Sequence, residues 1–220
     1  MIKYLPNFLT CCNLVCGMLG IIFLWENAAV PTAYFVWAAC LFDFFDGFAA
    51  RWLKVSSPIG KELDSMADMV SFGALPSLFI YQALTPPYLP YIALLIAICS
   101  ALRLAIFNLD TTQSDAFKGL PTPANAIFLT ALPFLQGLVV NVMGNTTLLA
   151  VIAVLFSVLL VSRIDLFALK FKNFNWADNK VRFTFLLLAV LLLAFFQWAA
   201  LPVIILLYIT LSLGVRVFSK

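Results

Sequence analysis

Long runs of apolar residues limit the folds available to this chain more than any other feature. Each run approaches the ~20 residues that an α-helix needs to cross a bilayer. The runs lack the alternation of β-barrel strands. With 64% hydrophobic and only 10% charged residues, the chain cannot be a soluble globular domain. We therefore predict an all-α integral membrane protein, one domain over residues 1–220, with about eight transmembrane helices whose approximate cores are 9–25, 33–53, 63–83, 88–108, 121–140, 146–166, 183–198 and 200–217.

The basic residues test this helix count and orient the protein. All 13 Lys and Arg residues fall on one side of an eight-helix arrangement, whereas the opposite connections carry Glu26 and no cation. By the positive-inside rule, both termini are then cytoplasmic, and we expect a multi-pass protein of the inner (cytoplasmic) membrane. The net charge of +3 favours anionic lipid headgroups. No basic-aromatic cluster outside the membrane indicates a nucleic-acid partner.

Two residue types narrow the chemistry further. Histidine is absent, which excludes Ser-His-Asp and Cys-His catalysis and every His-based metal site. The five cysteines lie in apolar stretches without a paired pattern, so we interpret them as reduced packing residues.

Four aspartates stand out, because carboxylates at membrane depth are costly and are rarely kept without a function. Asp43 and Asp46 are three residues apart and Ala50 follows four later, so all three share one helical face. Asp64 and Asp68 are four residues apart and share a face of the next helix. Two helices joined by a short turn would aim these carboxylates at one another, which requires cations between them. The spacing predicts a metal site with two divalent ions.

The residues beside the aspartates predict a phosphate-bearing ligand. Asp46 lies about seven residues from the cytoplasmic end of its helix, so a rise of ~1.5 Å per residue puts it ~10 Å deep, at headgroup level. Gly47 and Ala50 allow close approach by a helix or a flat ligand. Arg51, at the rim, suits bidentate contact with phosphate. The turn at 54–60 adds hydroxyls, N–H groups and a cation, which completes a set typical of metal-assisted phosphoryl transfer.

Two other interpretations of the aspartates remain open. They could form structural ion pairs with Arg51, Lys54 and Lys61, or they could line the proton or cation path of a transporter. The transporter interpretation gives no role to the glycine, alanine and arginine spaced between the aspartates.

The stretch Asp43-x2-Asp46-Gly47-x2-Ala50-Arg51-x8-Gly60-x3-Asp64-x3-Asp68 resembles the complete signature of the CDP-alcohol phosphatidyltransferase family. The resemblance implies an integral membrane transferase with a six-helix core, usually homodimeric, that takes a CDP-linked lipid and displaces CMP. It also implies that Asp43, Asp46 and Asp64 bind metal, and that Asp68 binds metal and acts as the catalytic base. The residues expected at the CDP-lipid by this resemblance are Gly47, Ala50, Arg51, Ser57, Gly60, Asn7 and Thr10.

Other segments resemble the phosphatidylserine synthase branch of this family, namely 6–13, 64–76, 103–108 and 118–124. That branch commonly has arginine where Ile106 stands, which weakens any role for a second arginine there. Arg103 is the candidate for holding the serine carboxylate, Asn108 for its ammonium or hydroxyl, and Ser71 for the serine pocket. Arg103 could instead be a positive-inside anchor, and Ser71 a helix-packing residue.

The resemblance therefore implies transfer from CDP-diacylglycerol to L-serine with two Mg²⁺ or Mn²⁺ ions. We expect Asp68 to accept the serine hydroxyl proton, as the carboxylate least committed to metal. Glycerol phosphate, inositol phosphate or choline remain alternative acceptors, and an archaeal lipid remains an alternative donor. A phosphate-bearing acceptor would need a denser basic cluster, which is absent near the signature, although the segment 163–182 carries several cations.

Overall fold

The computed structural model describes residues 2–55, 57–85, 87–109, 116–136, 141–167 and 176–218. These residues form helices and one two-stranded sheet. Among the η elements, η2 is a π-helical turn and the others are 3-10 helices. In chain order the elements are η1 (Ile2–Tyr4), α1 (Leu5–Trp25), α2 (Thr32–Leu53), α3 (Pro58–Asp68), η2 (Met69–Ala74), α4 (Leu75–Ala83), η3 (Leu89–Ala93), α5 (Leu94–Leu109), β1 (Ala116–Lys118), α6 (Thr122–Ala131), η4 (Leu132–Leu135), α7 (Thr146–Val161), β2 (Asp165–Phe167), α8 (Trp176–Phe196), η5 (Gln197–Ala199) and α9 (Ala200–Phe218).

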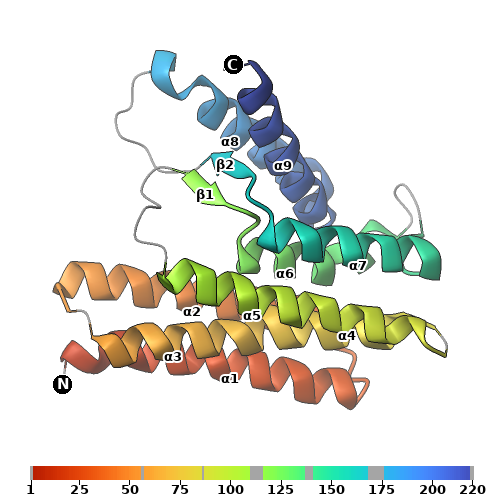
Figure 1. Ribbon diagram of the computed structural model, residues 1–220, viewed down its shortest axis with the longest axis horizontal. Coiled ribbons are helices and arrows are strands. Elements are labelled where there is room, and N and C mark those ends of the chain that lie inside the picture. The colour runs from red at the N-terminus through yellow and green to blue at the C-terminus, as the bar shows by residue number, and fades with distance from the viewer. Residues whose placement is uncertain are drawn as a thin grey trace.

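The helices α1, α2 and α5 and the continuous rod α3–η2–α4 run roughly along one direction (Figure 1). In this bundle α1 packs along α2 and also contacts α3 and η2, while α7 packs against α5 and α6 against α2. The hairpin of α8 and α9 crosses the other helices at a steep angle in the same view. The arrangement places the two aspartate-bearing helices, α2 and α3, beside α1.

The short turn between α2 and α3 follows from its local sequence. Lys54 ends α2 with a left-handed φ of 53°. Ser57 then caps α3, because its hydroxyl oxygen accepts a hydrogen bond from the Gly60 backbone N–H at 3.0 Å. Pro58 occupies the first turn, where its missing N–H would have no helical partner. The turn reverses the chain, so that the start of α3 lies beside the end of α2.

Two glycines allow α1 to approach the continuous rod α3–η2–α4 closely, and this rod is called the third rod below. A Cβ atom on Gly17 would overlap the Ser71 side chain and would lie 2.9 Å from the Ser71 Cα. A Cβ atom on Gly20 would lie 2.6 Å from Leu75 Cδ2. The absence of side chains at both positions lets the backbones meet. Leu75 and the fully buried Phe72 contribute to a hydrophobic cluster that also includes residues of α1, α2 and α6.

The predicted helical membrane protein is confirmed at the level of its segments. Each of the eight predicted cores falls largely within a helical segment, and five segments are long and apolar enough to cross a membrane. The shorter apolar helices are Thr122–Leu135 and Thr146–Val161. The number of eight crossings and the cytoplasmic termini stay predictions. The five long segments are Leu5–Trp25, Thr32–Leu53, Pro58–Ala83, Leu89–Leu109 and Asn179–Gly214, of which the last spans α8 and α9.

The sheet is a feature that the sequence did not predict. α7 ends at Val161, short of the predicted 166, because the chain turns there and β2 pairs antiparallel with β1. Gly119, with a φ of +76°, follows β1, and its N–H donates to the Ile164 carbonyl at 2.9 Å. A Cβ atom at Gly119 would lie 2.6 Å from the Leu160 carbonyl oxygen. The sheet thus holds residues 116–120 against the end of α7.

Candidate active site

Three of the four aspartates converge on one point. One carboxylate oxygen from each of Asp43, Asp64 and Asp68 lies within 4.8 Å of the other two. Asp43 is on α2, and the other two occupy successive turns of α3. Three anionic groups this close repel one another unless a cation lies between them. One of the oxygens, Asp64 Oδ1, is buried without a hydrogen-bond partner. Because all-oxygen donor sets suit Mg²⁺ and Mn²⁺, these residues fit a divalent ion.

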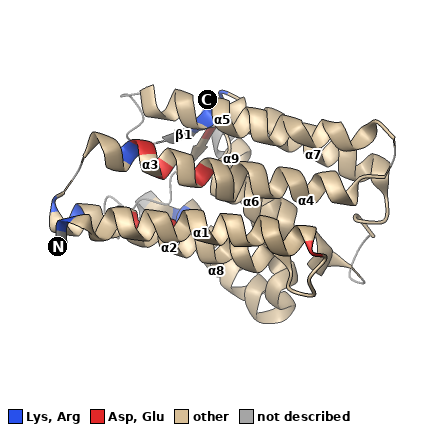
Figure 2. Cartoon of the chain, turned by 90° about the horizontal axis from the view of Figure 1, so that it is seen from below, with Lys and Arg blue, Asp and Glu red and all other residues tan. Residues whose placement is uncertain are grey.

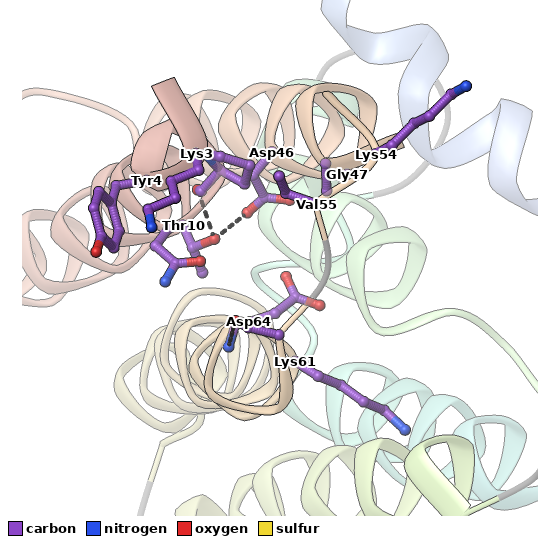
Figure 3. Close-up of a pocket in the computed structure, with 14 residues that line it drawn as sticks. Lys3, Tyr4, Thr10, Asp46, Gly47, Lys54, Val55, Lys61 and Asp64 are labelled. Carbon is purple, nitrogen blue, oxygen red and sulfur yellow. Dashed lines mark hydrogen bonds between the residues drawn. The ribbon is translucent and has the colours of Figure 1, made fainter. Parts of the chain in front are cut away.

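Asp46 lies beside this group and has a partner of its own. Its side chain is 6% exposed, and its Oδ2 accepts a hydrogen bond from Thr10 Oγ1 at 2.7 Å. Figure 3 shows the Asp46 and Asp64 side chains facing the same cavity from α2 and α3. The structure therefore brings all four predicted carboxylates to one region, with Asp43, Asp64 and Asp68 as its most compact part.

The nearby cations do not neutralise these carboxylates. Lys61 Nζ donates to the Asn108 backbone carbonyl at 2.6 Å. The Arg51 guanidinium lies over Gly47, since a Cβ there would be 3.4 Å from Arg51 Nη1. In the described part of the chain, no Lys or Arg nitrogen is within 4.0 Å of the three converging carboxylates. The structure therefore does not support structural ion pairing as the reason for these aspartates.

A cavity of about 600 Å³ opens between the start of α1, the end of α2 and the start of α3 (Figure 3). Six of the seven predicted CDP-lipid residues line it: Asn7, Thr10, Gly47, Ala50, Ser57 and Gly60. The seventh, Arg51, is exposed and is not among the lining residues. Asp46 and Asp64 complete the acidic side of the cavity, whereas Lys3, Lys54 and Lys61 supply positive charge. The cavity thus combines carboxylates, cations and small residues within reach of one ligand.

A polar face on α1 contacts the aspartates directly. Thr10 donates to Asp46, and Asn13 Nδ2 donates to Asp68 Oδ1 at 3.0 Å. The backbone carbonyl of Asn13 accepts a hydrogen bond from Ser71 Oγ at 2.9 Å. Asn13 is fully buried, and its own amide oxygen has no partner.

A second cavity, of about 510 Å³, lies at the ends of α5 and α7. It is lined by three cations, Arg103, Lys118 and Arg163, together with Asp165. Arg103 is nine-tenths buried and its Nε has no hydrogen-bond partner, while its Nη1 donates to Thr122 Oγ1 at 3.5 Å. These features suit an anionic ligand.

The other two predicted serine-binding residues contact helices instead of this cavity. Asn108 Nδ2 donates to Ser65 Oγ on α3 at 2.7 Å. Ser71 is fully buried against Gly17 of α1. Neither lines the cavity that contains Arg103, so the structure does not bring the three predicted residues together there.

Several residues of the site were not predicted from the sequence. Asn13 could have been found, because Asn7, Thr10 and Asn13 recur every three residues on one face of an otherwise apolar helix. Lys3 and Tyr4 line the first cavity because η1 leads into α1 at its mouth. In the sequence, the position of Lys3 and Tyr4 just before Pro6 and Asn7 indicated their place at the cavity only weakly.

The basic residues lie mainly at one end of the bundle, which is the end that carries the first cavity. In Figure 2 the Lys and Arg segments gather on the half of the molecule that carries the N-terminus and β1. The described connections at the other end, residues 26–31, 84–88 without 86, and 141–145, contain Glu26 and no Lys or Arg. Apolar helices with a carboxylate cluster beside a polar cavity define a membrane protein with an embedded acidic site that could hold a metal ion.

The chain belongs to the CDP-alcohol phosphatidyltransferase family, whose sequence pattern matches residues 3–161. The matched region contains the converging aspartates and the whole lining of the first cavity. The chain is 36% identical over 177 residues to the CDP-diacylglycerol–serine O-phosphatidyltransferase of Bacillus subtilis, covering 79% of this chain and 92% of that protein. It is 33% identical over 201 residues to the protein of the same name in Helicobacter pylori J99, covering 86% and 81%. An archaeal protein of this name, from Methanocaldococcus jannaschii, is 32% identical over 125 residues, covering 57% and 58%.

Proposed function

We propose that this protein transfers the phosphatidyl group of CDP-diacylglycerol to the hydroxyl of L-serine and releases CMP. The observation that carries the proposal is the convergence of Asp43, Asp64 and Asp68 beside a cavity lined by the family's signature residues. The relatives named above support the choice of substrates.

In this proposal the first cavity holds the CDP part of the donor lipid. Gly47 and Ala50 leave room for the nucleotide, because neither side chain extends into the space. The three lysines of the cavity attract the pyrophosphate. Two divalent cations, Mg²⁺ or Mn²⁺, held by Asp43, Asp46, Asp64 and Asp68, would neutralise pyrophosphate charge and stabilise the departing CMP.

The transfer step is a direct displacement at the phosphorus that carries the diacylglycerol. The serine hydroxyl oxygen forms a new bond to this phosphorus, and the bond from phosphorus to the CMP oxygen breaks. Asp68 accepts the hydroxyl proton, and CMP leaves with the bonding electrons. Asp68 suits this role because Asn13 already holds one of its oxygens and α3 aims it at the other aspartates.

The acceptor is proposed to bind on the side of Arg103. This guanidinium lines the second cavity, and its Nε has no hydrogen-bond partner among the described residues. A carboxylate held there would place the serine hydroxyl between Arg103 and the base. Asn108 and Ser71 would act by supporting helix contacts on α3 and α1.

One observation favours a second candidate acceptor that carries a phosphate. Lys118 and Arg163 line the same cavity as Arg103, so its lining carries further positive charge beside the single Asp165. Glycerol phosphate and inositol phosphate are therefore the acceptors to compare with serine.

The remaining parts of the proposal concern the surroundings of the site. We propose that the site opens to the cytoplasm from the bacterial inner membrane, because the cations and the first cavity share one end of the bundle. A homodimer is proposed on the resemblance to the family alone.

One assay tests these assignments together. Purified protein is given CDP-diacylglycerol, Mn²⁺ or Mg²⁺, and serine, glycerol phosphate, inositol phosphate or choline, and CMP is measured. We expect CMP with serine and none when the metal is chelated. Release of CMP with glycerol phosphate but not with serine would rule out serine as the acceptor. The absence of CMP with every alcohol, alongside metal-dependent ion flux in vesicles, would favour the transporter interpretation. A parallel reaction with an archaeal CDP-lipid tests the donor.

A further inference from the structure

The polar face of α1 lies between the aspartate-bearing helices and contacts both of them. Thr10 Oγ1 is 2.7 Å from Asp46 Oδ2 on α2, and Asn13 Nδ2 is 3.0 Å from Asp68 Oδ1 on α3. Thr10 and Asn13 are one helical turn apart on the same rigid helix. Their hydrogen bonds therefore link two carboxylates from different helices through one short piece of backbone.

Both contacts are buried, and both are directional. Thr10 is 3% exposed and Asn13 is fully buried. Thr10 Oγ1 also lies 3.0 Å from the Pro6 carbonyl oxygen, but it lies closer to Asp46 Oδ2, and an ionised carboxylate is the stronger acceptor for its single proton. Each bond fixes the rotation of a carboxylate that would otherwise turn about its terminal bond.

The amide of Asn13 carries a structural cost that packing does not explain. Among the described residues its Oδ1 is buried without a hydrogen-bond partner, which is unfavourable for a neutral acceptor. An apolar residue of similar volume would avoid this cost. What asparagine provides at this position, and an apolar residue would not, is the hydrogen bond to Asp68.

The backbone around Asn13 is held as firmly as its side chain. Ser71 Oγ, one turn beyond Asp68 on the third rod, donates to the Asn13 carbonyl. Gly17, one turn further along α1, packs against Ser71. These contacts fix the distance between α1 and the rod, so the Asn13 amide cannot drift away from Asp68.

We propose that Thr10 and Asn13 are positioning residues that use α1 as a common frame to orient Asp46 and Asp68. The inference rests on the proposed transferase function, because it assigns each contact to a different part of that reaction. Asp46 lines the donor cavity, so Thr10 acts on the binding of metal and CDP-lipid. Asp68 is the proposed base, so Asn13 acts on the transfer step.

The test compares Thr10→Val and Asn13→Leu, which keep side-chain size and remove the hydrogen-bond donor. We expect Thr10→Val to raise KM for CDP-diacylglycerol and weaken Mn²⁺ binding, and Asn13→Leu to lower kcat, each by ~10–100-fold. Thr10→Ser keeps the hydroxyl and should restore the wild-type KM. Asn13→Asp keeps the shape but replaces the donor with an acceptor, so kcat should stay low.

Thr130→Val is the matched control for Thr10→Val. Thr130 is also a buried helical threonine that donates to the carbonyl four residues earlier, but within the described part of the chain it donates to no carboxylate. Its variant should keep both kinetic constants. Melting temperatures in detergent complete the comparison. Asn13→Leu removes an unpartnered oxygen but also takes a hydrogen bond from Asp68, and because these effects oppose each other its melting temperature should stay close to that of the wild type.

The outcomes separate the inference from the proposed function. An active wild type with unchanged constants in both variants would overturn the inference. A drop in melting temperature that parallels lost activity would also overturn it, because it would make the contacts merely structural. A wild type that releases no CMP with any alcohol would refute the function instead. Mn²⁺ titration followed by electron paramagnetic resonance would then still show whether Thr10→Val weakens metal binding.

Discussion

The carboxylate of Asp68 is the residue-scale feature on which the most depends. It is 8% exposed within an apolar bundle, where an unpaired charge is costly. Asn13 offsets part of this cost through one hydrogen bond, and the aspartates around it add repulsion. A bound cation would resolve that repulsion, and the carboxylate would then remain ionised and could serve as the proposed base.

Replacing Asp68 with asparagine should separate binding from chemistry. Asp68→Asn keeps the side-chain shape and removes the base, so kcat should fall by ~10²–10⁴-fold while much of the CDP-lipid binding survives. Asp43→Asn should in addition lose metal-dependent nucleotide affinity. Steady-state CMP release and equilibrium CDP-lipid binding measure the two effects.

Glu62→Gln is the matched control for both variants. Glu62 is exposed on α3 and lines neither cavity, so neutralising it should change neither quantity. Wild-type turnover in Asp68→Asn would remove Asp68 from the role of base.

At this scale the sequence predicted the anionic residues and missed their partners. Helical spacing alone showed that Asp43 and Asp46 share a face, as do Asp64 and Asp68. Asn13 was missed because its importance depends on which carboxylate α1 happens to face. Asn108 and Ser71 were assigned to serine because nothing local indicated that they contact α3 and α1.

At the scale of elements, the contact between α1 and the third rod depends on the lack of a side chain at Gly17. Gly17→Ala would place a methyl group against Ser71 and push α1 away from η2. Such overpacking typically costs ~1–3 kcal/mol, so the variant should unfold at a lower temperature. Unfolding in detergent micelles, followed by circular dichroism, measures this change.

Gly214→Ala makes the same chemical change where there is room. Apart from its chain neighbours and the backbone of its own helix, no atom of the described residues lies within 4 Å of a Cβ atom at Gly214, which is part of α9. Alanine favours helix over glycine by up to ~1 kcal/mol, so this variant should be neutral or slightly stabilised. Equal destabilisation of both variants would contradict close packing at Gly17.

Element boundaries were predictable where the chain carries explicit signals. Ser57 and Pro58 mark the start of α3, and the break after Leu53 ends α2. The pairing of β1 with β2 had no such signal, because it joins segments some fifty residues apart through backbone bonds. The π-helical turn η2 was equally invisible, because its apolar sequence also fits a regular helix.

At the scale of the whole molecule, the second cavity could not be predicted from the sequence, because it is formed by residues from distant parts of the chain. Arg103 and Arg163 are far apart in the chain and meet only because α7 packs on α5. The eight helical segments, in contrast, followed from apolar run length alone. How many of them cross the membrane depends on α6 and α7, which are shorter than the others.

Cysteine labelling in oriented vesicles tests the predicted topology. In a variant lacking the five native cysteines, we expect Glu26→Cys and Gln136→Cys to react from the periplasmic side and Lys180→Cys from the cytoplasmic side. All three positions are exposed in the structure. Labelling of Gln136→Cys from the cytoplasm would show that α6 does not cross, and would reduce the number of spans.

The π-helical turn η2 has a consequence for how members of this family should be aligned. It accommodates one more residue than an α-helical turn of the same length, immediately after Asp68. A relative lacking one residue between positions 69 and 74 could form an unbroken α-helix there. Because the wider turn absorbs the extra residue, Ser77 and its bond to the Ala93 carbonyl would keep their direction relative to Asp64 and Asp68 in such a relative. A single-residue gap in this window therefore marks the loss of the π-helical turn, and the residues on its two sides can still be compared position by position.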